Sequence, residues 1–166
     1  MDVYLVRHAI AFEHDPAAWP DDRERPLTPQ GDKRFRQAAR GLRSLVPTVE
    51  VVLSSPLVRA WQTAAILQER AGWPQPLRFD QLEPGRPPAD ALAALQPHAS
   101  AGSLALVGHE PSLHELAAYL LSGDPNSLQL VFRKGGAAHL VFPESLAAGA
   151  AELHWLLAPK VLRALG

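Results

Sequence analysis

The chain opens with a short apolar run, residues 3–6, that ends abruptly on Arg7 and His8. Consecutive Val, Tyr and Leu residues are typical of a strand buried on both faces, whereas arginine and histidine need polar partners or solvent. In open α/β sheets the carboxyl ends of parallel strands face the ligand-binding crevice. We therefore expect a buried strand at the start of the chain and a binding or catalytic site at its end.

Two later segments repeat this succession of strand, polar residues and helix. Residues 50–55 form a second β-like run, which Pro56 halts before a helix rich in alanine and leucine. Residues 103–107 form a third run, followed by His109 and Glu110 and then by an amphipathic helix. Strands that alternate with helices favour parallel pairing. If the three strands are parallel, their polar ends lie along one rim of the sheet.

The positions of prolines and the spacing of apolar residues predict the structure of the segment between the first two strands. Residues 9–26 hold three prolines among charges and no sustained period, which is typical of a loop, here over the carboxyl end of the first strand. Thr28 and Pro29 are typical of a helix N-cap and first helical residue, and apolar residues continue at helical spacing to Leu45. A basic stripe on this helix is either a solvated face or a docking surface for an acidic protein; it consists of Lys33, Arg36, Arg40 and Arg43.

The tail of the chain has a different pattern. Residues 128–132, 137–142 and 152–157 look like strands joined without long helices, which favours antiparallel pairing at the sheet edge. We therefore expect a three-layer α/β/α sandwich with a mainly parallel, mixed sheet. Weaker signals predict a strand at residues 77–79, a short helix that ends before Pro97 and a final helix at residues 159–165.

Composition limits the class of protein. A length of 166 residues with 47% hydrophobic composition suits a single domain, residues 1–166, with a sizeable core. The 16 Lys and Arg against 17 Asp and Glu give a net charge of −1, so neither nucleic acid nor a membrane is expected as a partner. The absence of cysteine excludes disulfides, thiolate metal sites and a cysteine nucleophile. With no signal peptide and no apolar run near the roughly 18 residues of a membrane span, we expect a cytoplasmic protein.

Two arginines and two histidines occur at or just after the predicted strand ends: Arg7, His8, Arg59 and His109. This set suits a compact, multiply charged anion such as phosphate, because guanidinium groups bind phosphate oxygens bidentately and stay charged. The amino termini of the helices that follow the second and third strands add partial positive charge. Neutral imidazole is a nucleophile near pH 7, so His8 can attack phosphorus, form a phosphohistidine and be released by water.

Four ordered stretches carry a family resemblance: residues 5–9 (Leu-Val-Arg-His-Ala), 25–31 (Arg-Pro-Leu-Thr-Pro-Gln-Gly), 54–64 (Ser-Ser-Pro-Leu-Val-Arg-Ala-Trp-Gln-Thr-Ala) and 107–111 (Val-Gly-His-Glu-Pro). They resemble the histidine phosphatase superfamily, also called phosphoglycerate mutase-like, and the small size and the tail are most similar to its SixA branch of phosphohistidine phosphatases. The resemblance implies the phosphoglycerate mutase-like fold, phosphorylation of His8, a phosphate pocket of Arg7, Arg59 and His109, and no metal or organic cofactor. Ala9 replaces the usual glycine, as SixA-like members tolerate.

Glu83 lies where, by the same resemblance, many superfamily phosphatases have an acid that protonates the leaving oxygen. SixA-like proteins often lack this acid, and exchange of one P–N bond for another needs little help for the leaving group. Glu83 is therefore either a general acid that extends activity to phosphate esters or a solvated loop residue. Arg25, Ser55 and Lys134 are second-rank candidates for contacts with the substrate.

The leading hypothesis is a metal-independent phosphatase that hydrolyses phosphohistidine on a signalling or phosphotransfer protein. A phosphatase or mutase for a small phosphorylated metabolite is the alternative within the fold, and it requires residues 9–26, with His14, to enclose the ligand. A non-catalytic phosphate-binding module is the alternative from another class. A zinc site of His8, His109 and His114 is disfavoured, because the neighbouring arginines oppose a cation and no H-E-x-x-H motif is present.

Overall fold

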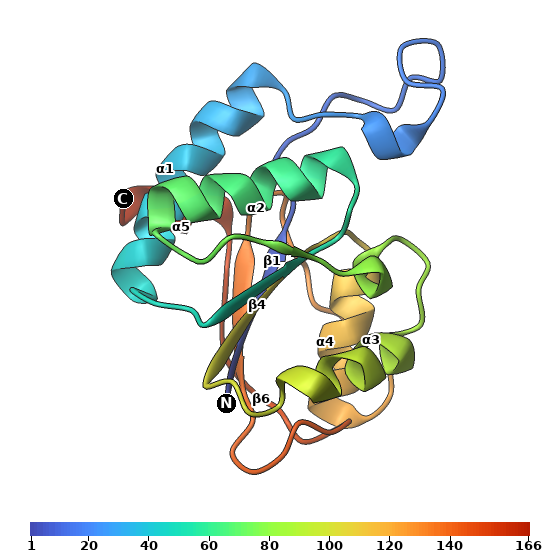
Figure 1. The fold of residues 1–166 in the computed structure, drawn as a ribbon, viewed down its shortest axis with the longest axis vertical. Coiled ribbons are helices and arrows are strands. Elements are labelled where there is room, and N and C mark those ends of the chain that lie inside the picture. Colours follow the sequence, from blue (N-terminus) through green and yellow to red (C-terminus); the bar gives the residue numbers. More distant parts are fainter.

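A computed structural model describes all 166 residues, and its strands form one six-stranded sheet with helices on both faces (Figure 1). The strands lie in the order β3-β2-β4-β1-β5-β6. None of the helices combines the length and the apolar character that crossing a membrane requires. The strands are β1 (Asp2–Arg7), β2 (Val51–Ser54), β3 (Leu77–Arg78), β4 (Ser103–Gly108), β5 (Ala137–Val141) and β6 (Glu152–Leu157). The α-helices are α1 (Pro29–Leu45), α2 (Val58–Ala71), α3 (Pro88–Leu95), α4 (Ser112–Ser122) and α5 (Pro159–Ala164).

Strand β1 lies inside the sheet. It pairs in parallel with β4 and antiparallel with β5. Strand β2 is parallel to both β3 and β4, whereas β5 and β6 are antiparallel to each other. The mainly parallel, mixed sheet expected from the sequence is therefore confirmed, and so is the antiparallel pairing of residues 137–141 with residues 152–157.

Helices cover both faces of this sheet. Successive side chains of a strand point to opposite faces, so Tyr4 and Val6 of β1 join one core while Val3 and Leu5 join the other. The first core includes side chains of α1, α2 and α5, and the second includes side chains of α3 and α4. The three-layer sandwich is confirmed, and residues 3–6 are uniformly apolar because neither face of β1 is exposed to water.

Helix α1 begins where the sequence predicts. The hydroxyl of Thr28 accepts a hydrogen bond from the N–H of Gly31 at 2.9 Å and caps the helix. A side chain at Gly31 has no room, because an added Cβ would lie 2.0 Å from the carbonyl oxygen of Ile10. The N–H of Thr28 also donates to that carbonyl oxygen at 3.0 Å. The residues directly after β1 are therefore held tightly against the start of α1.

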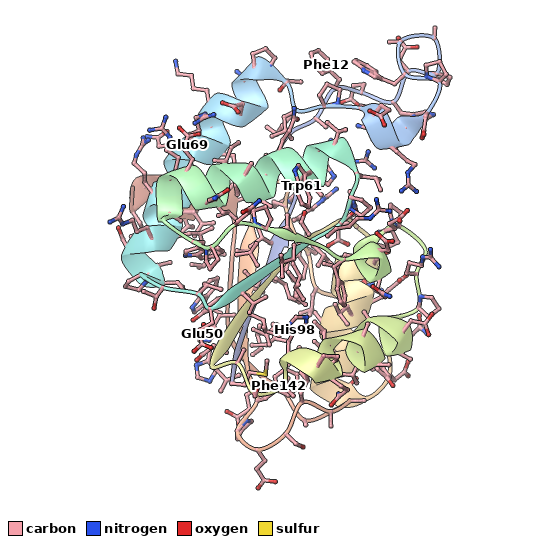
Figure 2. The ribbon with its side chains drawn as sticks, viewed as in Figure 1. Phe12, Glu50, Trp61, Glu69, His98 and Phe142 are labelled. Atoms are coloured by element: carbon pink, nitrogen blue, oxygen red, sulfur yellow. The ribbon has the colours of Figure 1, made fainter.

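Residues 9–26 form the expected loop beyond the carboxyl end of β1. Phe12 on this loop lies at the opposite end of the molecule from Phe142, which follows β5 (Figure 2). Ala11 forms an isolated antiparallel bridge with Leu27, and the loop also holds the short 3-10 helix η1 (Asp22–Glu24). The loop thus has fixed internal contacts, and η1 is the part that reaches the site described below.

The strand predicted at residues 128–132 is wrong. This segment has the apolar composition of a strand but no regular structure. Both neighbours of β1 are already in place, because β4 and β5 take its two edges. The segment instead buries Phe132, while Val131 is 65% exposed, and the carbonyl oxygen of Phe132 accepts a hydrogen bond from Arg7 at 2.6 Å. Its backbone therefore bonds a side chain at the end of β1 and does not extend the sheet.

Candidate active site

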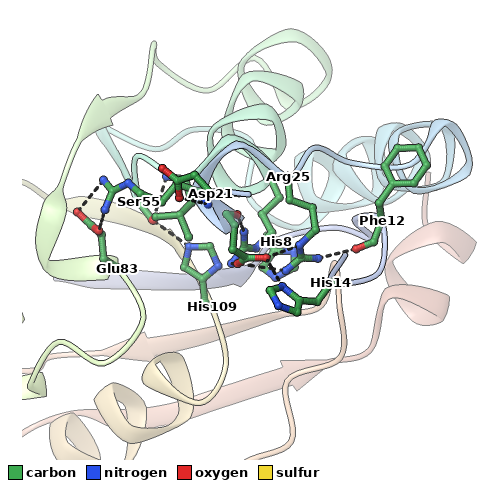
Figure 3. Close-up of polar contacts among 12 residues, drawn as sticks. His8, Phe12, His14, Asp21, Arg25, Ser55, Glu83 and His109 are labelled. Carbon is green, nitrogen blue, oxygen red and sulfur yellow. Dashed lines mark hydrogen bonds and ion pairs between the residues drawn. The ribbon is translucent and has the colours of Figure 1, made fainter. Parts of the chain in front are cut away.

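The polar ends of three strands meet at one edge of the sheet, as the sequence predicts. In the register of β1 and β4, Arg7 lies opposite Gly108. The N–H of His8 donates to the carbonyl oxygen of Gly108 at 3.0 Å, and the N–H of Ser55 donates to that of Val107 at 3.0 Å. These main-chain bonds place His8, Ser55 and His109 next to one another (Figure 3).

His8 is held in one tautomer. Its side chain is buried, and its Nδ1 atom lies 2.7 Å from the carbonyl oxygen of Ala9. A carbonyl oxygen can only accept, so Nδ1 carries the hydrogen and Nε2 of the neutral ring carries the lone pair. The N–H of Ala9 donates to the hydroxyl of Thr63 at 3.0 Å, which fixes the peptide that orients the ring. Nε2 is therefore available as a nucleophile.

Burial and neighbouring cations keep His8 neutral. Burial lowers the pKa of His8 to about 3, and the charges of Arg59, Arg7 and Lys134 act in the same direction. The imidazole is therefore uncharged at neutral pH, which is the state that can attack phosphorus.

His109 lies beside His8 in an equally dry setting. The two ring centroids are 5.1 Å apart, and Nε2 of His109 is 2.8 Å from the hydroxyl of Ser55. Burial again lowers the pKa of His109, with smaller contributions from His8 and Arg59. Both rings are thus neutral hydrogen-bonding groups near neutral pH.

The two arginines flank the histidines. Arg7 at the end of β1 donates from Nη1 to the carbonyl oxygen of Phe132. Arg59, in the first turn of α2, is 4% exposed and donates from Nη1 to the carbonyl oxygen of Asp22 at 2.8 Å. Burial lowers the pKa of both arginines from 12.5. Each guanidinium is therefore anchored by one nitrogen to main chain, which sets its orientation.

Three nitrogen atoms of these side chains are buried without any hydrogen-bond partner: Nε of Arg7, Nε of Arg59 and Nδ1 of His109. An unpaired buried polar group costs about 1–3 kcal/mol, so such groups are rare outside functional sites. All three come from residues that the sequence assigns to one phosphate pocket. An oxyanion at this edge is the ligand that would pair them, since arginine nitrogens only donate.

Asp22 is the site residue that sequence reasoning missed. Its carboxylate accepts from Nε of Arg25 at 2.6 Å and lies 3.0 Å from Nη2 of Arg59 and 3.1 Å from Nδ1 of His14. The hydrogen bond from Arg25 is the main reason that the pKa of Asp22 lies well below its usual range. Asp22 lies in an irregular loop within a run of mixed charges, where no periodic signal distinguishes it from solvated neighbours.

The remaining candidates lie around this centre. Arg25 is engaged by Asp22 and by the carbonyl oxygen of Phe12, and Ser55 is fully buried against His109 (Figure 3). Glu83 follows the short helix after β3, and its carboxylate is bridged to Arg23 of η1, with Nη2 to Oε1 at 3.3 Å. The structure thus brings all of them to the rim, with Arg25 and Ser55 already bonded to protein groups. No group of three or more His, Cys, Asp and Glu side chains is arranged to hold a metal ion.

The neutral state of both histidines predicts a pH dependence of stability. In the unfolded chain a histidine takes up a proton below about pH 6.5, whereas folded His8 stays neutral down to about pH 3. The unfolded state therefore binds more protons in this window, and the free energy of unfolding falls as the pH falls through it. Urea unfolding midpoints at pH 7 and pH 5 test this, and His8→Asn should remove about half of the dependence that the two histidines share. An equal dependence in that variant would contradict a neutral, buried His8.

Known proteins resemble this chain along most of its length. Residues 3–82 match the family model of the histidine phosphatase superfamily (branch 1). An uncharacterized protein of Picosynechococcus sp. is 39% identical over 125 residues, 74% of each chain. The structure of the protein histidine phosphatase SixA complexed with tungstate has a TM-score of 0.84 and 26% identity, covering 98% of this chain and 99% of that one. A protein assigned as a SixA phosphohistidine phosphatase, from Nakamurella multipartitia, has a TM-score of 0.76 and 30% identity over 96% of this chain and 97% of its own.

The fold and the residues at this sheet edge define an α/β phosphatase. The similarities in sequence and structure then specify the family: the chain belongs to the histidine phosphatase superfamily, in its SixA-type branch. The expected phosphoglycerate mutase-like fold is confirmed by the same structural match.

Proposed function

We propose that His8 is the nucleophile of a two-step phosphoryl transfer in which Arg7, Arg59 and His109 hold the phosphoryl group. The observation that carries this proposal is the set of buried, unpaired nitrogens on those three residues, beside an imidazole whose Nε2 bears a free lone pair. Two guanidinium groups held in place suit the negative charge on the transferring oxygens, because these cations need no reorientation during the reaction.

In the first step, the lone pair of His8 Nε2 forms a bond to phosphorus while the bond from phosphorus to the substrate breaks. The electron pair of that bond stays with the leaving nitrogen or oxygen, which takes a proton from solvent or, for a phosphate ester, from the candidate acid Glu83. In the second step, the oxygen of water bonds to phosphorus and the P–N bond to His8 breaks. The lone pair returns to Nε2, a proton from water is released and inorganic phosphate leaves.

The substrate that we propose is phosphohistidine on a phosphotransfer or signalling protein. Likeness over nearly the whole chain to the protein histidine phosphatase SixA supports this choice. Transfer between two imidazoles also makes little demand on a general acid, because a P–N bond is exchanged for another of similar strength.

A small phosphorylated metabolite is the second candidate, favoured by one feature of the loop. Helix η1 contacts Arg59 through Asp22 and contacts Glu83 through Arg23. The loop of residues 9–26 therefore bridges the two sides of the pocket, which is the arrangement that enclosing a small ligand requires.

One panel of phosphorylated substrates, assayed in the presence of a metal chelator, decides the substrate class. A phosphohistidine-bearing phosphotransfer protein, a sugar phosphate and an aryl phosphate are compared by kcat/KM. We expect turnover in chelator, with the phosphoprotein preferred by at least about tenfold. A reversed preference would establish the metabolite phosphatase instead, and binding without turnover of any substrate would establish a phosphate-binding module.

Glu83→Gln tests the leaving-group acid on the same panel. A general acid contributes most where the leaving group is a poor one, such as the alkoxide of a sugar phosphate. We expect the variant to lose about tenfold or more in kcat/KM on the sugar phosphate and less than about twofold on phosphohistidine. Equal losses on both would mean that Glu83 acts only through its ion pair with Arg23. Arg23→Gln, which removes that ion pair and leaves the carboxylate, is the matched control.

A further inference from the structure

A cavity of about 180 Å³ lies beside the phosphate pocket but shares none of its four central residues. It opens between the first turns of α1, helix α5 and the turn at residues 134–135. A space of roughly 10–15 Å³ already holds one water molecule, so this cavity can hold a small organic ligand. Its lining consists of Ala9, Ile10, Gly31, Arg34, Phe35, Ala38, Lys134, Gly135, Pro159 and Arg163.

The charges on this cavity have one sign. Arg34, Lys134 and Arg163 contribute to its wall, and no aspartate or glutamate does. None of the three takes part in an ion pair or a side-chain hydrogen bond, although the chain has 17 acidic residues. Arg36 of the same helix, in contrast, is bonded to Asp32 and Glu69. Three cations that line one cavity without an acidic side chain favour an anion there, because each attracts it and none is already paired.

The rest of the wall is apolar. Ile10 and Pro159 are half-buried, and Phe35 and Ala38 of α1 are buried. Ligand sites in proteins combine such apolar walls with a few polar groups that fix orientation. The wall therefore suits a ligand with an anionic group and a small apolar portion.

The cavity is physically connected to the nucleophile. The N–H of Gly135 donates to the carbonyl oxygens of Arg7 at 3.1 Å and His8 at 3.0 Å. The charge of Lys134 contributes to the lowered pKa of His8. A ligand in the cavity would therefore contact the segment that supports the catalytic backbone and neutralise a cation that acts on His8.

We propose that this cavity is a second oxyanion site, which binds a phosphate or carboxylate group carried on a small apolar body. The group is either a second anionic group of the substrate or part of a free effector. The site is separate from the phosphate pocket, so its occupancy can be measured whether or not the proposed reaction is correct.

Phenylphosphonate is the probe, because it joins an anion to an apolar ring and cannot be hydrolysed. Backbone amide NMR shifts of Gly31 and Ala38 report on the cavity, and the shift of Gly108 reports on the phosphate pocket. We expect saturable shifts at Gly31 and Ala38, with benzyl alcohol, the neutral analogue, at least about tenfold weaker. Arg34→Gln with Arg163→Gln should weaken this binding at least about tenfold and leave the Gly108 response in place. Arg40→Gln with Arg43→Gln removes the same charge from another part of α1 and should change neither response.

The two possible sources of the anion predict different effects of the double variant on KM. If the anion belongs to the substrate, the Arg34 and Arg163 double variant raises KM for the phosphoprotein and leaves p-nitrophenyl phosphate hydrolysis unchanged; if it is a free effector, KM is unchanged for both. Each result is compatible with a site that binds the probe. No saturable shift at Gly31 and Ala38 below about 10 mM (a binding free energy weaker than roughly 3 kcal/mol), or equal affinity in the double variant, would overturn the proposal.

Discussion

Replacement of His8 by alanine is expected to reduce kcat/KM by at least about 10⁴-fold on every phosphorylated substrate. No other group in the pocket is placed to replace it. In the proposed pocket Nδ1 of His109 donates its hydrogen to the oxyanion, so the lone pair of that ring is on Nε2, bonded to the hydroxyl of Ser55, and the arginines carry no lone pair at neutral pH. The loss should therefore fall on the first chemical step, whatever group carries the phosphate. Unfolding should not account for the loss of activity. The substitution leaves a cavity, which destabilises the fold, but it also removes a buried polar side chain whose desolvation has a free-energy cost.

Trapping the intermediate makes this prediction specific. Wild-type protein quenched during turnover of a labelled phosphodonor should retain label that is lost in acid and stable in base, and His8→Ala should retain none. His154→Ala makes the same substitution at an exposed position on β6 and should label normally. Label on the His8→Ala protein would mean that another residue is the nucleophile. Rapid turnover without label in the wild type would mean that water attacks the substrate directly.

It could be predicted from the sequence that these residues meet at one site, because a residue that ends or follows each strand marks where that strand stops. Pro56 follows the end of β2 and Gly108 ends β4, and in parallel strands such marks fall at the same edge of the sheet. Arg7, His8 and His109 follow from that pattern. Buried strands and the capped helix α1 are also local features, since period, propensity and capping residues lie within the segment itself.

Contacts between distant irregular segments could not be predicted in the same way. Asp22 approaches Arg59 across 37 positions of the chain, and the carbonyl oxygen of Phe132 approaches Arg7 across 125. Neither contact leaves a periodic trace, because η1 is a single turn and residues 128–132 have the apolar composition of a strand but no regular structure. Local pattern fixes which face a segment buries, whereas the choice of partner depends on which edges and carbonyl groups the assembled fold leaves free.

Arg59→Lys is expected to lower kcat/KM by about 10²-fold or more, although it keeps the positive charge. The guanidinium presents nitrogens in a rigid fork, so Nη1 and Nη2 can stay on the carbonyl and carboxylate oxygens of Asp22 while Nε faces the oxyanion. A lysine ammonium is a point charge on a flexible stem and cannot hold both positions. Arg70→Lys makes the same substitution near the exposed end of α2 and should have no effect on catalysis.

Arg59 also holds the loop of residues 9–26, so its two roles must be separated. Asp22→Asn weakens the contact between its side chain and Arg59 but leaves the carbonyl oxygen of residue 22 in place. If Arg59 acts on the phosphoryl group, this variant loses less than about fivefold, since a partly exposed ion pair contributes about 1 kcal/mol or less. Inorganic phosphate should also bind Arg59→Lys more weakly than Asp22→Asn. If both variants instead lose activity equally, Arg59 would be a residue that positions the loop, and the phosphoryl group would depend on Arg7 and the two neutral histidines alone.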